Sequence, residues 1–295
     1  MYYRRKIALS LLQVFENELE KIQVHKLLFL LSRYQTKKKT YDFVPYKYGS
    51  FSFQANADLN TLKKYGIVDE TSTTWKKLDE TNYLIQLDKE HQKIVADFAI
   101  IYKNKSSDDL IKLTYKNFPY YAINSTIAHK YLNTKELAKL ENYKSKEKEI
   151  TLFTIGYEGI SLESYLNKLL RNNVALLCDV RKNAASMKYG FSKKQLENAC
   201  NSVGIKYMHM PAVGIDSDKR QQLNSQSDYD TLFKDYISTN LTKTIEEQEI
   251  ILTLLQENKR IALTCFEADN CQCHRTHLAK AISNLDKFEY VIEHL

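Results

Sequence analysis

Long apolar runs are absent from this 295-residue sequence. No stretch reaches the roughly eighteen apolar residues that a membrane-spanning helix needs, so we expect no membrane partner. The basic and then apolar start, MYYRRKIALSLLQVFENELEKI, is interrupted by glutamates, and no small-residue cleavage site follows it. The sequence therefore predicts a first helix rather than a secretory signal, and a cytoplasmic protein.

Cysteine is scarce as well, and its number is odd. The five cysteines are Cys178, Cys200, Cys265, Cys271 and Cys273, and most of them lie in apolar runs. This pattern argues against a disulfide framework and favours free thiols in a reducing compartment. Internal repeats and low-complexity tracts are absent too, and the length suffices for two ordinary domains, each with its own core.

The first half of the chain has too few acids to balance its bases. Residues 1–150 contain 26 Lys and Arg against 18 Asp and Glu, a net charge of +8, whereas residues 151–295 carry a net charge of −1. Such an excess is typical of a domain that binds nucleic acid. A lysine-rich, solvated surface gives the same count, and a protein partner also stays open.

A charged stretch, LENYKSKEKEI, marks the boundary between the two halves. We place a basic recognition domain at 1–148 and a second domain at 149–295. Apolar residues at helical spacing predict helices over 5–16 and 21–35, and another over 53–68 that Gly66 ends. A hairpin follows at 75–87 and more helices lie between 90 and 140. This order predicts a mostly helical, winged-helix-like fold.

The second domain alternates short strands with helices. Strands are predicted at 151–156, 175–180, 205–210, 260–266 and 289–295. Helices are predicted at 161–172, 192–203, 228–258 with a break near Asn240, and 275–284. This alternation predicts an α/β domain with a parallel, Rossmann-like sheet covered on both faces.

Polar residues follow these strands where a parallel sheet binds ligands, beyond the carboxyl ends. The residues expected at this edge are Gly156, Glu158, Asp179, Arg181, His209, Cys265, Glu267, His274 and Arg275. Each has a simpler interpretation: Asp179 could cap a turn with Arg181 as its ion-pair partner, His209 could be a satisfied core histidine, and Gly156 could serve a tight turn.

The sulfur-rich stretch CFEADNCQCHR (265–275) has three interpretations. A zinc knuckle is disfavoured, because the cysteine spacing is unusual and adjacent Cys273 and His274 would not easily reach one ion. A nucleophilic thiol would need activation, which the start of the following helix could give to Cys273. An anion site at Arg275, on the first turn of that helix, is the interpretation that we favour, with a thiol role second and no metal.

Four motifs carry a family resemblance. TIGYEG, CDVRKNAASMKYGFSKKQL, GIKYMHMPAVG and LTCFEADNCQCHRTHLA resemble, in this order, the bacterial family called domain of unknown function 488. The resemblance spans 151–295 and carries over Gly156, Asp179, Arg181, Tyr207, His209, Gly214, Cys265, Glu267, Cys273, His274 and Arg275. The family implies no established reaction. Cys271 is extra, and VG stands where many members have LG.

The first domain has a weaker resemblance over about residues 5–80. KIQVHKLLFLLSRY and YDFVPYKYGSFSFQANADLNTLKKYGIV are similar to winged-helix-like domains related to Panacea antitoxins. Ser50 replaces the proline of their YGPFS-like turn. The resemblance implies recognition of a protein or nucleic acid.

Two functions fit these features. The first is a hydrolase for a phosphodiester or N-glycosidic bond of nucleic acid or a nucleotide, which would suit DNA modification or phage defence. Catalysis would come from Glu158, Asp179, Glu267, His209 and Cys265, while Arg181, Arg275, His274 and Gly156 would bind the anion. The second is a non-catalytic sensor of an anionic ligand. The sequence does not identify a cofactor.

Overall fold

The structure is a computed structural model, and it describes residues 1–36, 39–143, 149–220, 223 and 225–295. The chain forms two compact units, Met1–Tyr143 and Lys144–Leu295. The predicted boundary at residue 148 lies outside the described residues. Every helix in the described part of the chain is too short or too polar to cross a membrane.

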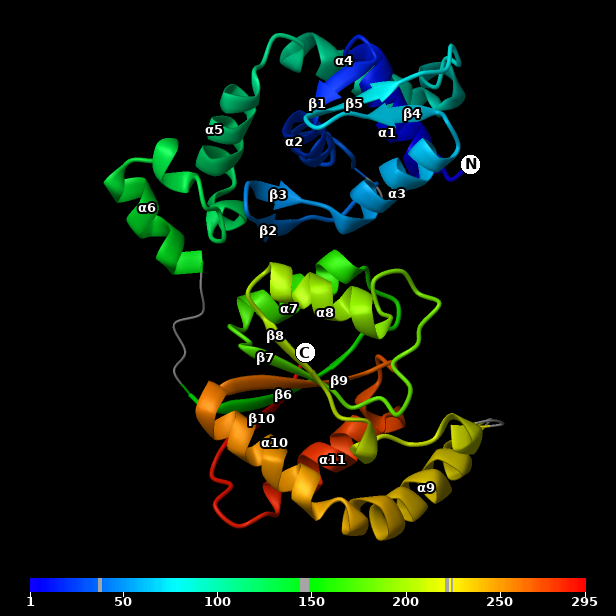
Figure 1. The fold of residues 1–295 in the computed structure, drawn as a ribbon, viewed down its shortest axis with the longest axis vertical. Coiled ribbons are helices and arrows are strands. Elements are labelled where there is room, and N and C mark those ends of the chain that lie inside the picture. The colour runs from blue at the N-terminus through cyan, green and yellow to red at the C-terminus, as the bar shows by residue number, and fades with distance from the viewer. Residues whose placement is uncertain (37–38, 144–148, 221–222, 224) are drawn as a thin grey trace. The chain divides into compact units, whose positions relative to one another are not determined.

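The first unit is mostly helical and has the element order of a winged helix (Figure 1). Strand β5 pairs antiparallel with both β1 and β4, giving a small sheet in the order β1-β5-β4. Its elements are α1 (Tyr3–Val14), β1 (Glu18–Glu20), α2 (Lys21–Leu31), β2 (Val44–Tyr46), β3 (Gly49–Phe51), α3 (Phe53–Lys64), β4 (Val68–Glu70), β5 (Thr74–Lys77), α4 (Lys89–Tyr102), α5 (Ser107–Asn117) and α6 (Thr134–Leu140). The predicted winged-helix-like fold is confirmed.

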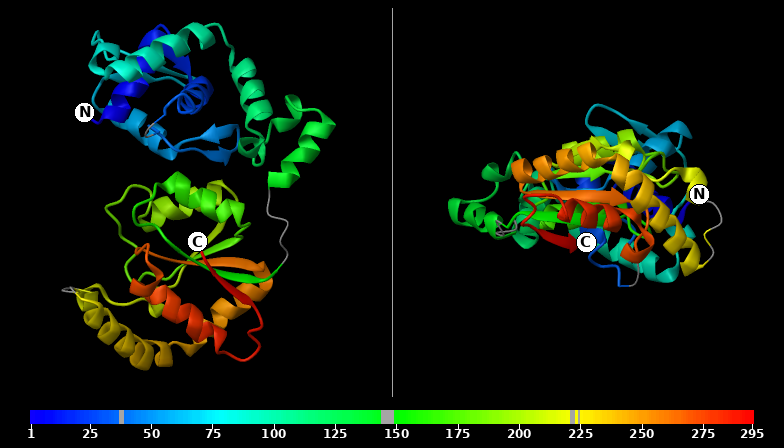
Figure 2. Two further views of the ribbon diagram at one scale, coloured as in Figure 1. Left: turned by 180° about the vertical axis from the view of Figure 1, so that it is seen from behind. Right: turned by 90° about the horizontal axis from the view of Figure 1, so that it is seen from below.

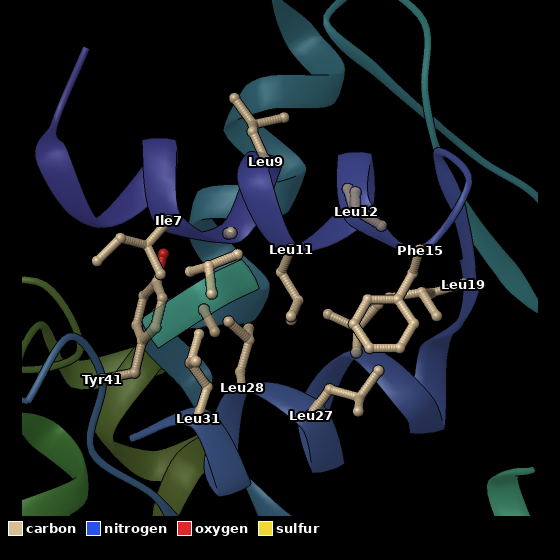
Figure 3. Packing of buried hydrophobic residues seen from close by; sticks show 14 of the residues in the cluster. Ile7, Leu9, Leu11, Leu12, Phe15, Leu19, Leu27, Leu28, Leu31 and Tyr41 are labelled. Atoms are coloured by element: carbon tan, nitrogen blue, oxygen red, sulfur yellow. The ribbon is translucent and has the colours of Figure 1, made fainter. Parts of the chain in front are cut away.

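The core of this unit forms between the apolar faces of α1 and α2. Figure 3 shows Leu11 of α1 directed towards Leu28 of α2, with the Tyr41 ring beside Ile7 and the Phe15 ring beside Leu27. The helices end close to their predicted limits, and Gly66, with φ of +68°, ends α3 in the left-handed conformation that glycine allows.

The predicted hairpin at 75–87 is wrong. The hairpin is β4–β5, and its turn is made by threonine, with Thr71 Oγ1 accepting hydrogen bonds from the backbone N–H groups of Thr73 and Thr74. After β5 the chain leaves the sheet and forms a 3-10 turn at Leu84–Gln86. The β2–β3 hairpin was not predicted, because its strands have only three residues each and show no alternation.

The second unit is a five-stranded, wholly parallel sheet in the order β10-β6-β9-β7-β8. Its elements are β6 (Thr151–Gly156), α7 (Leu162–Arg171), β7 (Leu176–Asp179), α8 (Lys193–Ser202), β8 (Lys206–His209), α9 (Gln226–Asp235), α10 (Ile245–Asn258), β9 (Arg260–Cys265), α11 (His274–Ser283) and β10 (Val291–His294). A π-helical segment, Tyr236–Leu241, lies at the break predicted near Asn240. The predicted parallel α/β fold is confirmed.

Helices cover both faces of this sheet. Helices α7 and α8 lie on one face, and α10 and α11 lie on the other (Figures 1 and 2). The central strands β6 and β9 are therefore buried at every residue. Because β9 lies between β6 and β7, its carboxyl end is flanked by theirs, and this is where the polar residues collect.

Candidate active site at the carboxyl edge of the second sheet

The strand register brings the predicted edge residues into one row. Gly156 of β6 lies opposite Cys265 of β9, and Asp179 of β7 lies between Thr264 of β9 and His209 of β8. The convergence expected from the ends of parallel strands is therefore present. The residues of the row nevertheless differ in burial and in hydrogen-bond partners, so we describe their contacts one by one.

Asp179 and Arg181 form a buried ion pair. Arg181 donates from Nε to Asp179 Oδ1 at 2.7 Å and from Nη2 to Oδ2 at 2.5 Å, while Tyr207 donates its hydroxyl to Oδ2 at 2.6 Å. Arg181 Nη1 donates to the Tyr157 hydroxyl and to the Phe191 carbonyl. Burial opposes the charge of Arg181, but its hydrogen bonds with Asp179 outweigh that effect and raise its pKa above the usual value.

This ion pair is the simpler interpretation given above, in which Arg181 is the ion-pair partner of Asp179. Asp179 is fully buried and its two oxygens already accept four hydrogen bonds, including one from the Arg181 backbone N–H. A carboxylate held in this way is unsuited to act as a general base. The structure therefore places Asp179 in a buried ion pair at the edge of the sheet, and its predicted catalytic role stays a prediction.

A pocket of about 360 Å³ lies over the carboxyl end of β9. It is lined from the β7 side by Arg181, Lys182 and Asn183 and from the β9 side by Cys265, Phe266, Glu267 and His274. Its volume is within the range of small-molecule sites. Glu158, Asp179, His209 and Arg275 are not among the described residues that line it.

Cys265 contacts two other predicted residues, Glu267 and His274, at this pocket. The Cys265 thiol donates to Glu267 Oε2 at 3.1 Å, and its sulfur lies 3.5 Å from His274 Nδ1. His274 Nε2 lies 3.0 Å from the Val180 carbonyl oxygen. Because a carbonyl can only accept, Nε2 carries a proton, and in the neutral ring Nδ1 is left as an acceptor directed at the sulfur.

Cys273 completes a sulfur and nitrogen cluster with these residues. Ligand atoms of Cys265, Cys273 and His274 all lie within 4.8 Å of one another, and all three residues are buried. Adjacent Cys273 and His274 therefore do reach a common point, contrary to the expectation from their spacing. Cys271 is exposed.

The predicted activation of Cys273 by the helix start is wrong. Cys273 does occupy the N-cap position of α11, but its side chain is fully buried. Burial, reinforced by the hydrogen bond with Cys265, holds the pKa of the Cys273 thiol well above its usual value. Desolvation therefore outweighs the field of the helix start.

Arg275 does not lie in the pocket. Its side chain is fully buried, and it donates from Nη1 to the Glu267 carbonyl at 2.6 Å and from Nη2 to Asn270 Oδ1 at 2.7 Å. A third donation, from Nη2, goes to the Ala268 carbonyl. The structure places this side chain against the loop that carries Glu267, and the predicted anion-binding role of Arg275 stays a prediction.

Gly156 and Glu158 also hold this loop. A Cβ added to Gly156 would lie 1.9 Å from the Glu267 carbonyl oxygen, so only glycine allows the two backbones to approach. The exposed Glu158 accepts from the Ala268 N–H at 3.1 Å. Both residues were predicted to act on the ligand, and the structure instead gives them contacts with the backbone beside Glu267.

His209 binds the backbone rather than the pocket. Its Nε2 lies 2.8 Å from the Arg181 carbonyl oxygen, a contact that fixes the turn after β7. The satisfied histidine considered from the sequence is what the structure contains, although on an edge strand and half-buried.

Several residues of the site were not predicted. The ring of Tyr157 stacks on Phe191 with centroids 4.2 Å apart, and Lys188 Nζ donates to the Tyr157 carbonyl. Lys182 lines the pocket next to Arg181. For Tyr157 and Lys182 the signal was available, since both lie directly beside residues that had been selected at the strand ends.

The comparisons with known proteins reach part of the second unit. No curated protein and no solved structure matches the chain. The resemblance of the first unit to Panacea-related domains is not confirmed. Residues 161–282, which lie in the second unit, match the family model described as Domain of unknown function DUF488.

Proposed function

We propose that the second unit is a hydrolase-type enzyme that acts on a nucleotide or on nucleic acid in the pocket above β9. The observation that carries this proposal is the contact of Cys265 with both Glu267 and His274 at the pocket. A thiol, a carboxylate and an imidazole acceptor together can generate a nucleophile and move a proton.

Glu267 is the proton carrier in this proposal. Hydrolysis adds water across a bond: oxygen joins the electrophilic phosphorus or carbon, the bond to the leaving group breaks, and the leaving group takes a proton. The Glu267 carboxylate takes a proton from the attacking side and returns it to the leaving group. The nucleophile is generated beside Cys265 and His274. Glu267 is close to it, because its carboxylate contacts the Cys265 sulfur.

Lys182 is the best placed side chain for a phosphate. It lines the pocket, its side chain is 43% exposed, and its ion pair with Asp216 is long at 3.8 Å. Arg181 contributes positive charge, although its guanidinium nitrogens already donate to Asp179, Tyr157 and Phe191. The rings of Tyr157 and Phe266 line the same pocket and could pack against a base.

The experiment is an assay of the full-length chain against nucleosides, nucleotides, and single- and double-stranded DNA and RNA, with products identified by mass spectrometry. We expect hydrolysis of at least one of these compounds. Replacement of Cys265 by Ser should lower its rate by about 100-fold or more, because one reacting group is changed. Cys271→Ser is the matched control, since Cys271 is exposed in the same loop, and should leave the rate unchanged.

The first unit is the proposed nucleic-acid-binding half. The supporting observation is its charge, since the net positive charge of the chain lies in residues 1–150. Part of it is balanced internally: Arg4 and Arg5 both bind Asp58. Affinity of the chain for DNA or RNA should fall steeply as salt rises, and salt-independent or undetectable binding would favour a protein partner.

A second candidate is a sensor that binds an anionic ligand without turnover. The observation in its favour is the separation of the acidic groups: Asp179 pairs with Arg181, Glu158 binds the Ala268 N–H, and Glu267 binds Cys265. A two-metal nuclease would need such carboxylates to meet. Ligand binding in the pocket with no product from any compound of the panel would establish this candidate instead.

A further inference from the structure

We propose that Cys265, Cys273 and His274 bind a zinc ion beside the pocket, and that this ion carries the water that attacks the substrate. The metal site stands on the geometry alone. Only the role of its water rests on the proposed hydrolase function.

The spacing of the three ligand atoms fits one ion. Zinc binds thiolate sulfur at about 2.3 Å and imidazole nitrogen at about 2.0 Å, so tetrahedral geometry separates sulfur and nitrogen by about 3.5 Å. Cys265 Sγ and His274 Nδ1 are 3.5 Å apart. All three ligand atoms lie within 4.8 Å of one another, so a small contraction brings the second sulfur to the same centre.

His274 is oriented as a metal ligand. Histidines that bind a metal usually donate their second ring N–H to a carbonyl or carboxylate, which fixes the tautomer and leaves the other nitrogen free for the ion. His274 Nε2 lies 3.0 Å from the Val180 carbonyl, and Nδ1 faces the sulfur. Val180 directly follows β7, so the sheet itself positions the ring.

The fourth position faces the pocket. Cys265, Glu267 and His274 line the pocket, whereas Cys273 is fully buried and is not among the described residues that line it, so a ligand completing the tetrahedron would enter from the pocket side. Three protein ligands with one open position are typical of catalytic rather than structural zinc. The Glu267 carboxylate, 3.1 Å from Cys265 Sγ, is within reach of a water at that position.

The donor set distinguishes this cluster from the other buried thiols. Cys178 and Cys200 are also fully buried, and burial raises the pKa of Cys178 to about 12. Neither belongs to the metal-ligand group found among the described residues, which contains two sulfurs and an imidazole nitrogen. Two thiolates and an imidazole suit zinc rather than magnesium or calcium, which prefer oxygen.

The ion supplies the nucleophile that the reaction needs. Bound zinc lowers the pKa of its water towards 7, so Glu267 can take the proton at neutral pH. The resulting hydroxide adds to the electrophilic phosphorus or carbon of the substrate. The bond to the leaving group then breaks, and the proton on Glu267 passes to the leaving group.

The test is metal analysis of the full-length chain, without a histidine tag, after reconstitution with zinc and removal of excess. We expect one zinc per chain. Cobalt in place of zinc should give the thiolate-to-cobalt charge-transfer band and the strong visible bands of a tetrahedral sulfur site. Cys273→Ser should lose most of the metal or weaken the charge-transfer band, and Cys271→Ser should retain both signals.

Cobalt spectra of the unsubstituted chain keep the test valid if Cys273→Ser does not fold. A folded chain that holds no zinc and gives no charge-transfer band would overturn the metal site. Hydrolysis by such a zinc-free chain, blocked by alkylation of Cys265, would overturn it and leave the proposed function intact. Stoichiometric zinc in a chain that hydrolyses nothing would support the metal site and contradict the proposed function.

Discussion

The two units of this protein bury positive charge in different ways. In the first unit, Lys26 of α2 is 1% exposed and donates to neutral oxygens of the β2–β3 hairpin, the Tyr48 carbonyl and Ser50. Burial lowers the pKa of Lys26 to about 7. In the second unit, Arg181 is buried against the Asp179 carboxylate and its pKa stays above the usual value.

Because of this difference, Lys26 in the first unit changes its charge near neutral pH, whereas Arg181 in the second unit keeps its charge. Next to Lys26, burial and the neighbouring ammonium lower the pKa of His25 to about 3. A buried base without a carboxylate loses its proton, whereas an arginine paired with one keeps its charge. The first unit should therefore respond to pH near neutrality, while the charge of Arg181 in the second unit stays constant.

Asp179→Ala should have the largest effect on stability. It would leave the Arg181 guanidinium buried without its carboxylate, which costs roughly 3–5 kcal/mol. Urea unfolding followed by circular dichroism measures the loss. The control is Asp235→Ala, which breaks the exposed Lys219–Asp235 pair and should change stability little. Equal effects of the two substitutions would show that the buried pair is not special.

Acid should destabilise the first unit selectively. The unfolded chain protonates His25 below about pH 6.5, but the folded unit does so only near pH 3, so stability falls as pH drops through this window. From pH 7 to pH 4 the loss is roughly 3 kcal/mol. Fluorescence of Trp75, the single tryptophan and a buried residue of this unit, reports the unfolding.

The low pKa of Lys26 predicts how the stability of the first unit changes above neutral pH. The unfolded chain keeps its Lys26 proton up to about pH 10.5 and the folded unit only up to about pH 7, so stability rises between these values. Lys26→Met removes the titrating group and should flatten this rise. An unchanged pH slope in the variant would contradict the assignment.

Gly156→Ala should lower stability by a smaller amount and should also weaken substrate binding in the pocket. The added Cβ would meet the Glu267 carbonyl, and such overpacking costs roughly 1–3 kcal/mol. The loop of Glu267 would have to move, so substrate affinity should fall together with stability. A crystal structure of the variant checks the displacement, and an unmoved loop would show that the contact is easily relieved.

The sequence predicted the second unit better than the first for a physical reason. Strands such as β6 and β9 are apolar throughout because both faces of the sheet are covered, and long helices separate them. The strands of the first unit have three or four residues, too few for a period of two to emerge. The hairpin was predicted at 75–87, whereas its strands are β4 and β5.

The place of the site followed from topology, but the roles of its residues did not. Strand ends predicted that Asp179, Cys265 and Glu267 would share one edge. Whether a side chain points into the pocket depends on partners that the sequence does not reveal: Arg275 turns inward because the loop at 267–270 presents oxygens to it. The Cys273 cluster was missed because adjacent residues were assumed to diverge.

The most direct test of the central claim, that the pocket performs chemistry and does not only bind, is Glu267→Gln measured for both binding and turnover. Gln keeps the size and a hydrogen-bonding oxygen but cannot carry the proton. We predict that the turnover rate of the hydrolysed nucleotide or oligonucleotide falls by about 100-fold or more, while its dissociation constant changes by only a few-fold. Unchanged turnover in this variant, with or without weaker binding, would contradict the account.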